Sequence, residues 1–400
     1  MLKSKVLSLK SKALSQKSEI NGFNSFPKVV KHLRLPTAAL AMLLAMQRNA
    51  SAQSPFNAFA NLFIQPKSYI VNYTQSPPVI DGDISDAVWQ SAAWTDNFVD
   101  IEGDLKPAPA FPTHAKMLWD DSCLYIAAEI TDPQVWATLK QHDEIIFRDD
   151  DFEVFVDPNN TTHQYFELEF NAFNTVFDLF LNKPYREGGN AMINWDAEGL
   201  RSAVKVQGTI NNPGDVDKGW TIEIAIPFKA ISLGNNVQVP INGTLWRINF
   251  SRVEWDTKPV NGKYVKLTDS AGRNLPEHNW VWSPQGVINM HYPERWGYLQ
   301  FNKGYTNNTA FALPYAEQQK TYLWLVYYRE KQWQQQHDGY QSSLKKLKIK
   351  QTVKIGGHVN SLRLEATAHQ FMALISDPES ITTWTINQEG LVSRLPAKAE

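Results

Sequence analysis

The chain has 400 residues, 43% of them hydrophobic and 20% charged, and a formal net charge of -2 at neutral pH. This composition allows a full hydrophobic core without a signature of disorder, and the length leaves room for two or three domains. The weak charge provides no field that would collect nucleic-acid phosphates or an anionic membrane surface, so no nucleic-acid partner is expected.

Residues 1–52 are expected to be a targeting segment. Several basic residues in 28–34 precede a short apolar run over 35–46, and the small residues 50–52 follow it. This is the order of a signal peptide, and the run is too short to span a bilayer as a helix. We expect cleavage after Ala52, a secreted, periplasmic or cell-surface location, and no transmembrane anchor. An organellar transit peptide and a start codon assigned too far upstream remain open alternatives.

Residues 53–66 are expected to be a linker and residues 67–303 a β-sandwich. Apolar and polar residues alternate in 166–170, 220–226 and 246–250, which predicts strands with one face in a core. Turn-forming clusters of Asn, Asp, Pro and Gly separate these segments and leave no room for helices between most neighbours. The other predicted strands are 114–119, 123–130, 152–157, 175–181, 203–210 and 296–301. The predicted fold class is therefore all-β, an antiparallel, jelly-roll-like sandwich.

Residues 304–400 are expected to form a small C-terminal α+β unit. A stretch rich in Gln, Glu, Lys, Leu and Tyr predicts one helix over 316–336 and a short helical turn through Leu344. Strands are predicted at 349–355, 361–367 and 381–387. The pattern leaves open whether this unit packs on the sandwich or folds alone.

Four motifs occur in order along the sandwich region. They are IDGDISDAVW at 80–89, DDSCLYIAA at 120–128, DDFEVFVDP at 150–158 and PERWGYL at 293–299. Together they resemble the family 9 carbohydrate-binding modules over roughly residues 69–302. The resemblance implies a β-sandwich that holds a sugar unit in a slot, often with bound calcium. It also implies a role beside glycoside hydrolases that degrade plant or algal polysaccharide.

The resemblance further implies that the sugar lies between two tryptophans, with charged and amide side chains binding its hydroxyls. One tryptophan would come from the loop before the 152–157 strand, where Trp136 and the charged stretch 142–151 are nearest. The second would lie beside the 293–299 motif, where this chain departs from the family. The candidates there are His291, Tyr292, Trp282 and Trp255.

Sugar binding needs an aromatic ring against the axial C–H face of a pyranose and planar polar groups for its hydroxyls. Trp195, in a predicted loop, is a further candidate ring. If neighbouring strands align, their outward polar side chains form a hydrogen-bonding floor; the alternative is a solvated sheet face with cross-strand ion pairs. The candidate polar contacts are Arg148, Glu153, Glu167, Glu169, Asn171, Arg247 and Asn249.

Three adjacent aspartates make a candidate metal site. Ca²⁺ prefers clustered oxygen ligands, so Asp149, Asp150 and Asp151 are candidate calcium ligands. The function expected from the whole sequence is carbohydrate binding without cleavage, in an exported glycan-degradation system.

Two alternatives to this function remain. A glycoside hydrolase needs two carboxylates at a set separation, for which Glu153, Glu167 and Glu169 are candidates, although nothing in the sequence fixes that separation. A cofactor-bearing sandwich is suggested by Met290 and His291 as haem ligands. Adjacent residues of a strand point to opposite faces, which argues against this pair.

Overall fold

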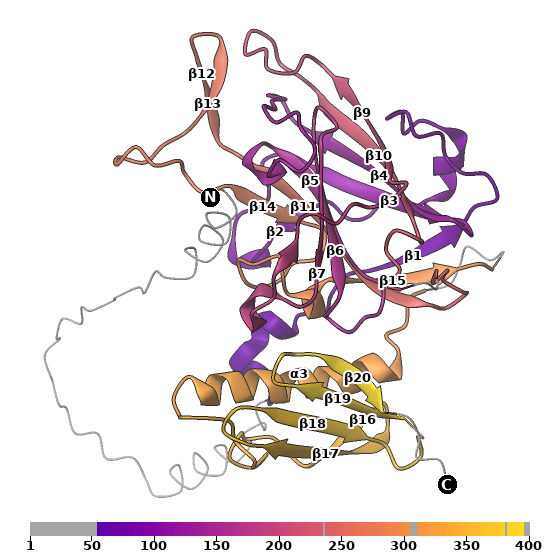
Figure 1. The fold of residues 1–400 in the computed structure, drawn as a ribbon, viewed down its shortest axis with the longest axis vertical. Helices are drawn as coiled ribbons and strands as arrows, with labels where there is room; N and C mark the ends of the chain where they lie inside the picture. Colours follow the sequence, from indigo (N-terminus) through magenta and orange to yellow (C-terminus); the bar gives the residue numbers. More distant parts are fainter. Residues whose placement is uncertain (1–53, 235–236, 305–309, 381, 396–400) are drawn as a thin grey trace, which may run out of the picture. The chain divides into compact units, whose positions relative to one another are not determined.

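The computed structural model describes residues 54–234, 237–304, 310–380 and 382–395 (Figure 1). The expected signal segment, residues 1–52, lies outside the described residues. From Ser54 onward the chain forms one compact unit. In the described ranges, no helix is both long enough and apolar enough to cross a membrane.

One curled sheet makes up the sandwich, which confirms the all-β class (Figure 1). Its neighbouring strands are antiparallel, except that β1 runs parallel to both β15 and β3. The pair β14 (His278–Val281) and β2 (Val99–Asp100) extends the sheet beside β11. The order along the sheet is β8 (Ala191–Met192), β7 (Val176–Leu181), β6 (Tyr165–Asn171), β5 (Asp151–Asp157), β11 (Leu245–Glu254), β15 (Gly297–Asn302), β1 (Ser68–Tyr73), β3 (Thr113–Trp119), β4 (Cys123–Thr131), β10 (Gly219–Pro227) and β9 (Arg201–Gln207).

The main core lies between the two halves of the curled sheet. In one half Val154 and Phe250 are cross-strand neighbours, and in the other half Ile126 pairs with Ile224. All four are fully buried members of one apolar cluster. Because each such side chain contributes roughly 1.5–3 kcal/mol when removed from water, the inward positions of the alternating strands fix this packing.

The outer face of β5 and β6 is buried as well, which differs from the expected half-buried strands. Every residue of both strands is buried. Phe155 and Tyr165 on this face pack with Trp296 and Met290 from the chain before β15 in a second apolar cluster. Polar side chains that alternate with these aromatic residues therefore lie in the interior.

A two-stranded hairpin, β12 (Thr257–Val260) with β13 (Lys263–Lys266), follows β11 and stands apart from the curled sheet at the top of Figure 1. Asn261 and Gly262 both have positive φ, 52° and 74°, at its turn. An Asn-Gly turn of this kind matches the twist of a hairpin. The hairpin brings its last residue, Lys266, back to the end of β11.

The C-terminal residues form a helix over a five-stranded antiparallel sheet. The helix α3 (Tyr315–Gln334) agrees closely with the predicted 316–336, and the stretch 344–348 is a turn. Leu323 and Tyr327 of α3 pack with Ile375 and Ile386 of the sheet. The sheet order is β16 (Thr352–Ile355), β17 (His358–Ala366), β18 (Phe371–Ser376), β19 (Thr383–Asn387) and β20 (Val392–Leu395). β18 and β20 are absent from the predicted set.

Contacts between this α+β part and the sandwich answer the question that the sequence left open. Arg247 of β11 forms a buried ion pair with Glu317 of α3, at 3.2 Å. The expected linker contains a 3-10 helix, η1 (Asn57–Phe63). The ring of Phe56, at its N-cap, packs against Tyr322 of α3, and the ring of Phe63 packs against Tyr328 of α3. The α+β part is therefore packed onto the sandwich.

Candidate functional site

Two of the predicted tryptophans share one lysine. The ammonium of Lys266 lies 3.2 Å from the ring centroid of Trp255 and 5.6 Å from that of Trp136. It also donates a hydrogen bond to the backbone carbonyl of Arg148. Both ring distances are within the reach of a cation–π interaction. We call Trp136 and Trp255 the tryptophan pair.

The backbone around β5 and β11 holds Trp255. Its N–H donates to Asp150 Oδ1 at 2.7 Å, and its indole Nε1–H donates to the carbonyl of Phe147 at 3.0 Å. The side chain remains half-buried, so part of the ring is open to solvent. Trp255 is thereby fixed in orientation but accessible.

Trp136 lies in the loop after β4 and is only 5% exposed. Its indole Nε1–H is buried and donates no hydrogen bond to the described residues. Buried polar groups are nearly always hydrogen-bonded in native proteins, and a buried indole N–H usually finds an acceptor. The pair therefore combines two rings with one donor that a hydroxyl oxygen would satisfy.

Charges around the tryptophan pair are strongly perturbed by burial. Burial lowers the pKa of Lys266 to about 8, although Asp150 and Asp149 favour its charged form. One buried acidic group lies beside Trp255: Asp132, Asp150 and Glu254 have carboxylate oxygens within 4.8 Å of one another. Burial raises the pKa of Glu254 to about 7, opposed by Arg252, which donates to it at 2.7 Å.

The predicted polar floor does share one face of β6, β5 and β11. Glu169, Glu153 and Ser251 are successive cross-strand neighbours, and Glu167 and Asn249 flank Phe155 in the next row. The register therefore meets the condition set for a polar floor, but each of these residues is at most 4% exposed because the outer layer covers the face.

Hydrogen bonds of this face run largely to the protein itself. Asn249 exchanges two hydrogen bonds with the backbone of Ser283. Asn171 donates to the carbonyl of Leu139 and to Asp149. Arg247 donates to the Trp296 carbonyl, the Tyr298 hydroxyl, Asn160 and Glu317. Their contact with a sugar stays a prediction.

The remaining candidates lie in other surroundings. Trp195 packs against Phe166 with ring centroids 4.9 Å apart. The guanidinium carbon of Arg186 lies over the ring of Tyr292, 4.1 Å from the ring centroid. His291 Nδ1 is 3.0 Å from the hydroxyl of Tyr165, and its Nε2 is 3.8 Å from Glu167 Oε2. Trp136, Trp195 and Tyr292 thus contact three different sets of residues.

The three adjacent aspartates also diverge. Asp149 accepts hydrogen bonds from the N–H and hydroxyl of Thr138, the N–H of Leu139 and the amide of Asn171, so its oxygens are engaged. Asp150 joins the group beside Trp255. Asp151 instead lies with Glu153 and Glu169, with oxygens within 4.8 Å of one another.

The group of Asp151, Glu153 and Glu169 fits a hard cation better than the three aspartates that are adjacent in the sequence. Asp151 Oδ2 is fully buried and accepts no hydrogen bond from the described residues. Burial raises the pKa of Asp151 well above its ordinary value, and Glu153 and Glu169 add to the effect. Ca²⁺ takes several carboxylate oxygens at 2.3–2.6 Å, roughly the arrangement such a cluster offers. We call these three carboxylates the buried acidic trio.

Lys266 is the functional candidate that the sequence did not indicate. Its hairpin has no apolar alternation that would predict a strand there. Lys266 and Trp136 are also 130 positions apart in the sequence. Only the folded position of the hairpin reveals the contact.

Comparison with known proteins adds a family match over more than half of the chain. The model of the family described as "Carbohydrate family 9 binding domain-like" matches residues 80–301. Exoglucanase XynX of Acetivibrio thermocellus is 28% identical over 217 residues, which are 54% of this chain and 17% of that protein. Endo-1,4-beta-xylanase A of Thermoanaerobacterium saccharolyticum is 26% identical over 187 residues, 47% of this chain and 13% of that protein.

Among solved structures, a family 9 carbohydrate binding module from Caldicellulosiruptor kristjanssonii in complex with cellotriose is 19% identical, with a TM-score of 0.39. The match covers 62% of this chain and 100% of that module. The curated relatives are much longer, since this chain spans less than a fifth of their length. The family model carries the assignment: the chain belongs to the carbohydrate family 9 binding domain-like family.

Proposed function

We propose that this chain binds a carbohydrate without cutting it and that the sugar ring lies at the tryptophan pair. Membership of a carbohydrate-binding family supports the general function. The observation that carries the location is the sharing of one ammonium by the rings of Trp136 and Trp255. Two indole rings within reach of one ammonium offer apolar surface to the C–H face of a pyranose.

Lys266 occupies the position that a sugar ring would take against Trp255. A half-buried cation–π contact is worth about 1–2 kcal/mol, which a stacked sugar would have to replace when it displaces the ammonium. The buried indole N–H of Trp136 would then donate to a sugar hydroxyl. Displaced Lys266, together with Arg148, supplies polar groups at the rim.

The substrate class in this proposal is a β-1,4-linked plant polysaccharide such as xylan or cellulose. Its support is that the curated relatives are named as xylanases and an exoglucanase. In the proposal the protein is exported and works at the cell surface, in the periplasm or outside the cell, beside glycoside hydrolases. It presents or retains polysaccharide for enzymes carried by other chains.

Hydrolysis by this chain is not part of the proposal. The candidate pair Glu153 and Glu169 are cross-strand neighbours buried at 4% and 0% exposure. A glycosidase needs its two carboxylates on opposite sides of an accessible glycosidic bond. We expect no release of reducing sugar from xylan or cellulose, and release that disappears in Glu153→Gln would contradict this.

We propose a calcium site at the buried acidic trio, in place of the run of three aspartates. Bound Ca²⁺ would neutralise Asp151, Glu153 and Glu169 and tie β5 to β6. Calcium is then expected to raise the melting temperature of the full chain, and the rise should vanish in Asp151→Asn. Asp149→Asn serves as the control, because the Asp149 oxygens are engaged with Thr138 and Leu139. An equal calcium response in both variants would overturn the assignment.

Calorimetric titration against xylan, cellulose, mannan and algal glycans tests the proposed function. We expect saturable binding to at least one glycan, weakened tenfold or more in Trp255→Ala. Trp94→Ala is the matched control: Trp94 is 40% exposed and also lies beneath a lysine ammonium, that of Lys116 at 4.3 Å. Binding to none of the glycans with calcium present, or equal binding by the two variants, would contradict the proposal.

A further inference from the structure

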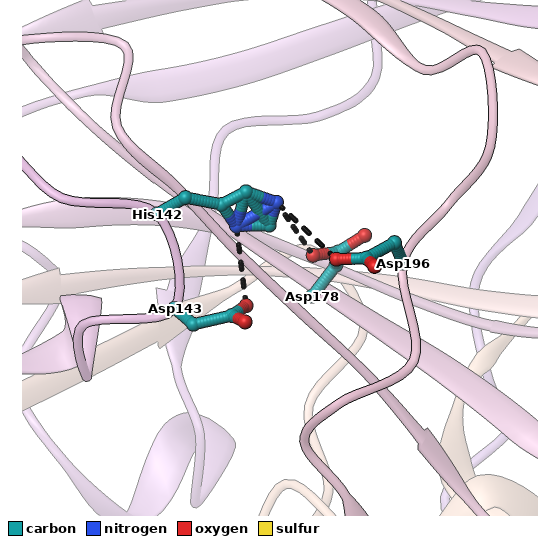
Figure 2. Close-up of side chains that lie close together, drawn as sticks. All are labelled: His142, Asp143, Asp178 and Asp196. Carbon is teal, nitrogen blue, oxygen red and sulfur yellow. Dashed lines mark ion pairs between the residues drawn. The ribbon is translucent and has the colours of Figure 1, made fainter.

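A histidine and three aspartates from separate segments converge at one end of β7 (Figure 2). His142 and Asp143 come from the loop between β4 and β5, Asp178 from β7, and Asp196 from the loop after β8. Each offers one ligand atom, and the four atoms lie within 4.8 Å of one another. Sequence spacing alone does not reveal this group, because its members are spread over 55 positions.

The two ring nitrogens of His142 face different partners (Figure 2). Nδ1 lies 3.1 Å from Asp143 Oδ1. Nε2 lies 3.5 Å from Asp196 Oδ1 and 3.7 Å from Asp178 Oδ1. In metal sites, a carboxylate on one imidazole nitrogen commonly fixes the tautomer that presents the other nitrogen to the ion. Asp143 is placed for that positioning role.

Asp178 provides the independent sign that something binds here. Its side chain is 2% exposed, and its Oδ1 is buried without a hydrogen bond to any described residue. Its other oxygen, Oδ2, accepts the backbone N–H of Ala197, which holds the carboxylate in place with Oδ1 turned toward His142. A fixed, desolvated carboxylate oxygen costs free energy unless a cation or donor meets it.

The charges of the group add to this cost. Asp143, Asp178 and Asp196 each offer a carboxylate oxygen, and these oxygens lie within 4.8 Å of one another. A divalent cation among these carboxylates would replace their mutual repulsion by attraction.

We propose that His142 Nε2, Asp178 Oδ1 and Asp196 Oδ1 bind one divalent transition-metal ion, with Zn²⁺ the best fit, and that Asp143 positions the imidazole. Zn²⁺ accepts imidazole nitrogen and carboxylate oxygen at about 2.0–2.2 Å. The distances from His142 Nε2 to Asp196 Oδ1 and Asp178 Oδ1, 3.5 and 3.7 Å, are close to the roughly 3.3 Å between two ligand atoms of a tetrahedral Zn²⁺ ion. An imidazole ligand favours Zn²⁺ over Ca²⁺, which takes oxygen ligands.

Exposure of the group leaves a coordination position for water. The side chains of His142 and Asp196 are 53% and 69% exposed, so the ion would enter from solvent onto the buried Asp178. The ion would join the 142–143 loop to β7 and to the loop that carries Trp195. The proposal does not depend on carbohydrate binding, since none of its ligands belongs to the tryptophan pair or the buried acidic trio.

Titration of the untagged full chain with Zn²⁺, in saturating calcium, tests the site. Wild type is expected to bind one more equivalent of Zn²⁺ than His142→Ala or Asp178→Asn. Asp143→Asn should retain the site with about 10–100-fold lower affinity, as loss of an outer carboxylate does elsewhere. His278→Ala is the matched control, because His278 also pairs with an aspartate, Asp256 at 3.2 Å, but belongs to no such group among the residues that the structure describes.

X-ray absorption at the zinc edge gives the second readout. The zinc equivalent that is lost in His142→Ala is expected to have one imidazole nitrogen ligand, and its other ligands are expected to be oxygen atoms. Circular dichroism checks that each variant is folded. Equal zinc stoichiometry in wild type and His142→Ala, or loss of an equivalent in His278→Ala but not in His142→Ala, would overturn the proposal.

Discussion

Glu330 of α3 is a fully buried carboxyl group whose Oε2 accepts the backbone N–H of Gln341 at 2.9 Å. Burial raises its pKa from the ordinary 4.5 to about 7, and the Gln341 hydrogen bond opposes the rise. Between these two pH values the folded chain keeps a proton that the unfolded chain has lost. The contribution of Glu330 to the free energy of unfolding therefore falls as pH rises through that window.

Glu330→Gln keeps the acceptor for Gln341 and removes the charge. We expect this variant to match wild type at pH 4.5 and to be more stable by about 1–2 kcal/mol at pH 8, measured by urea unfolding. A stability difference independent of pH would contradict the assignment.

The proposed site at the tryptophan pair predicts that Lys266 makes glycan binding depend on pH. Its pKa is lowered to about 8, so the charged ammonium that competes for the ring of Trp255 is lost as pH rises from 7 to 9. Glycan affinity is expected to increase several-fold over this range in calorimetric titrations. Lys266→Met should bind more tightly at pH 7 and lose the pH dependence. Affinity that falls with pH in wild type would show that the ammonium assists the sugar.

For single residues, the sequence indicated which side chains are candidates better than it indicated whether they are buried. The motif order pointed to Trp136, and the strand alternation put Glu167 and Glu169 on one face, which the register shows they share with Glu153. Their burial was not predictable, because it depends on Trp296 and Met290 folding over that face from a distant part of the chain. Alternation reports which residues share a face but not what covers it.

At the scale of elements, β11 is joined to α3 by a buried ion pair. Glu317 accepts hydrogen bonds from Arg247, Lys320 and Asn160. Of these donors, Arg247 and Lys320 are charged, and both are no more than 6% exposed. Glu317→Ala would leave two buried cations without their carboxylate, which typically costs 3–5 kcal/mol, roughly half of a domain's stability.

Thermal or urea unfolding of Glu317→Ala measures this loss. Glu198→Ala is the control, because Glu198 pairs with Lys229 at 2.9 Å on the surface and should cost less than about 1 kcal/mol. Equal losses in the two variants would mean that the Arg247–Glu317 link contributes nothing beyond an exposed pair.

The elements themselves followed the sequence where period or length was clear. Strands such as β4 and β10 and the helix α3 agree with prediction within two residues. The missed β18 is an unbroken apolar run, which periodicity cannot assign to strand or helix, and the missed β20 has only four residues.

At the scale of the molecule, segments from both ends of the described chain close onto each other. Phe56, Phe59 and Phe63 pack with the cluster under α3, which also contains residues of β18 and β19. Sandwich and α+β part should therefore unfold together. We expect tryptophan fluorescence and far-ultraviolet circular dichroism to give coincident urea transitions for the full chain. Two separated transitions would mean that the α+β part is an independent domain.

The most direct test of carbohydrate binding at the tryptophan pair is nuclear magnetic resonance of the 14 tryptophan indole N–H groups during a glycan titration. Signals are assigned by single Trp→Phe substitutions. The account predicts that the Trp136 and Trp255 signals shift together and saturate, while that of Trp94 stays in place. Saturable shifts confined to Trp195 or other indoles, with both members of the pair unchanged, would contradict it.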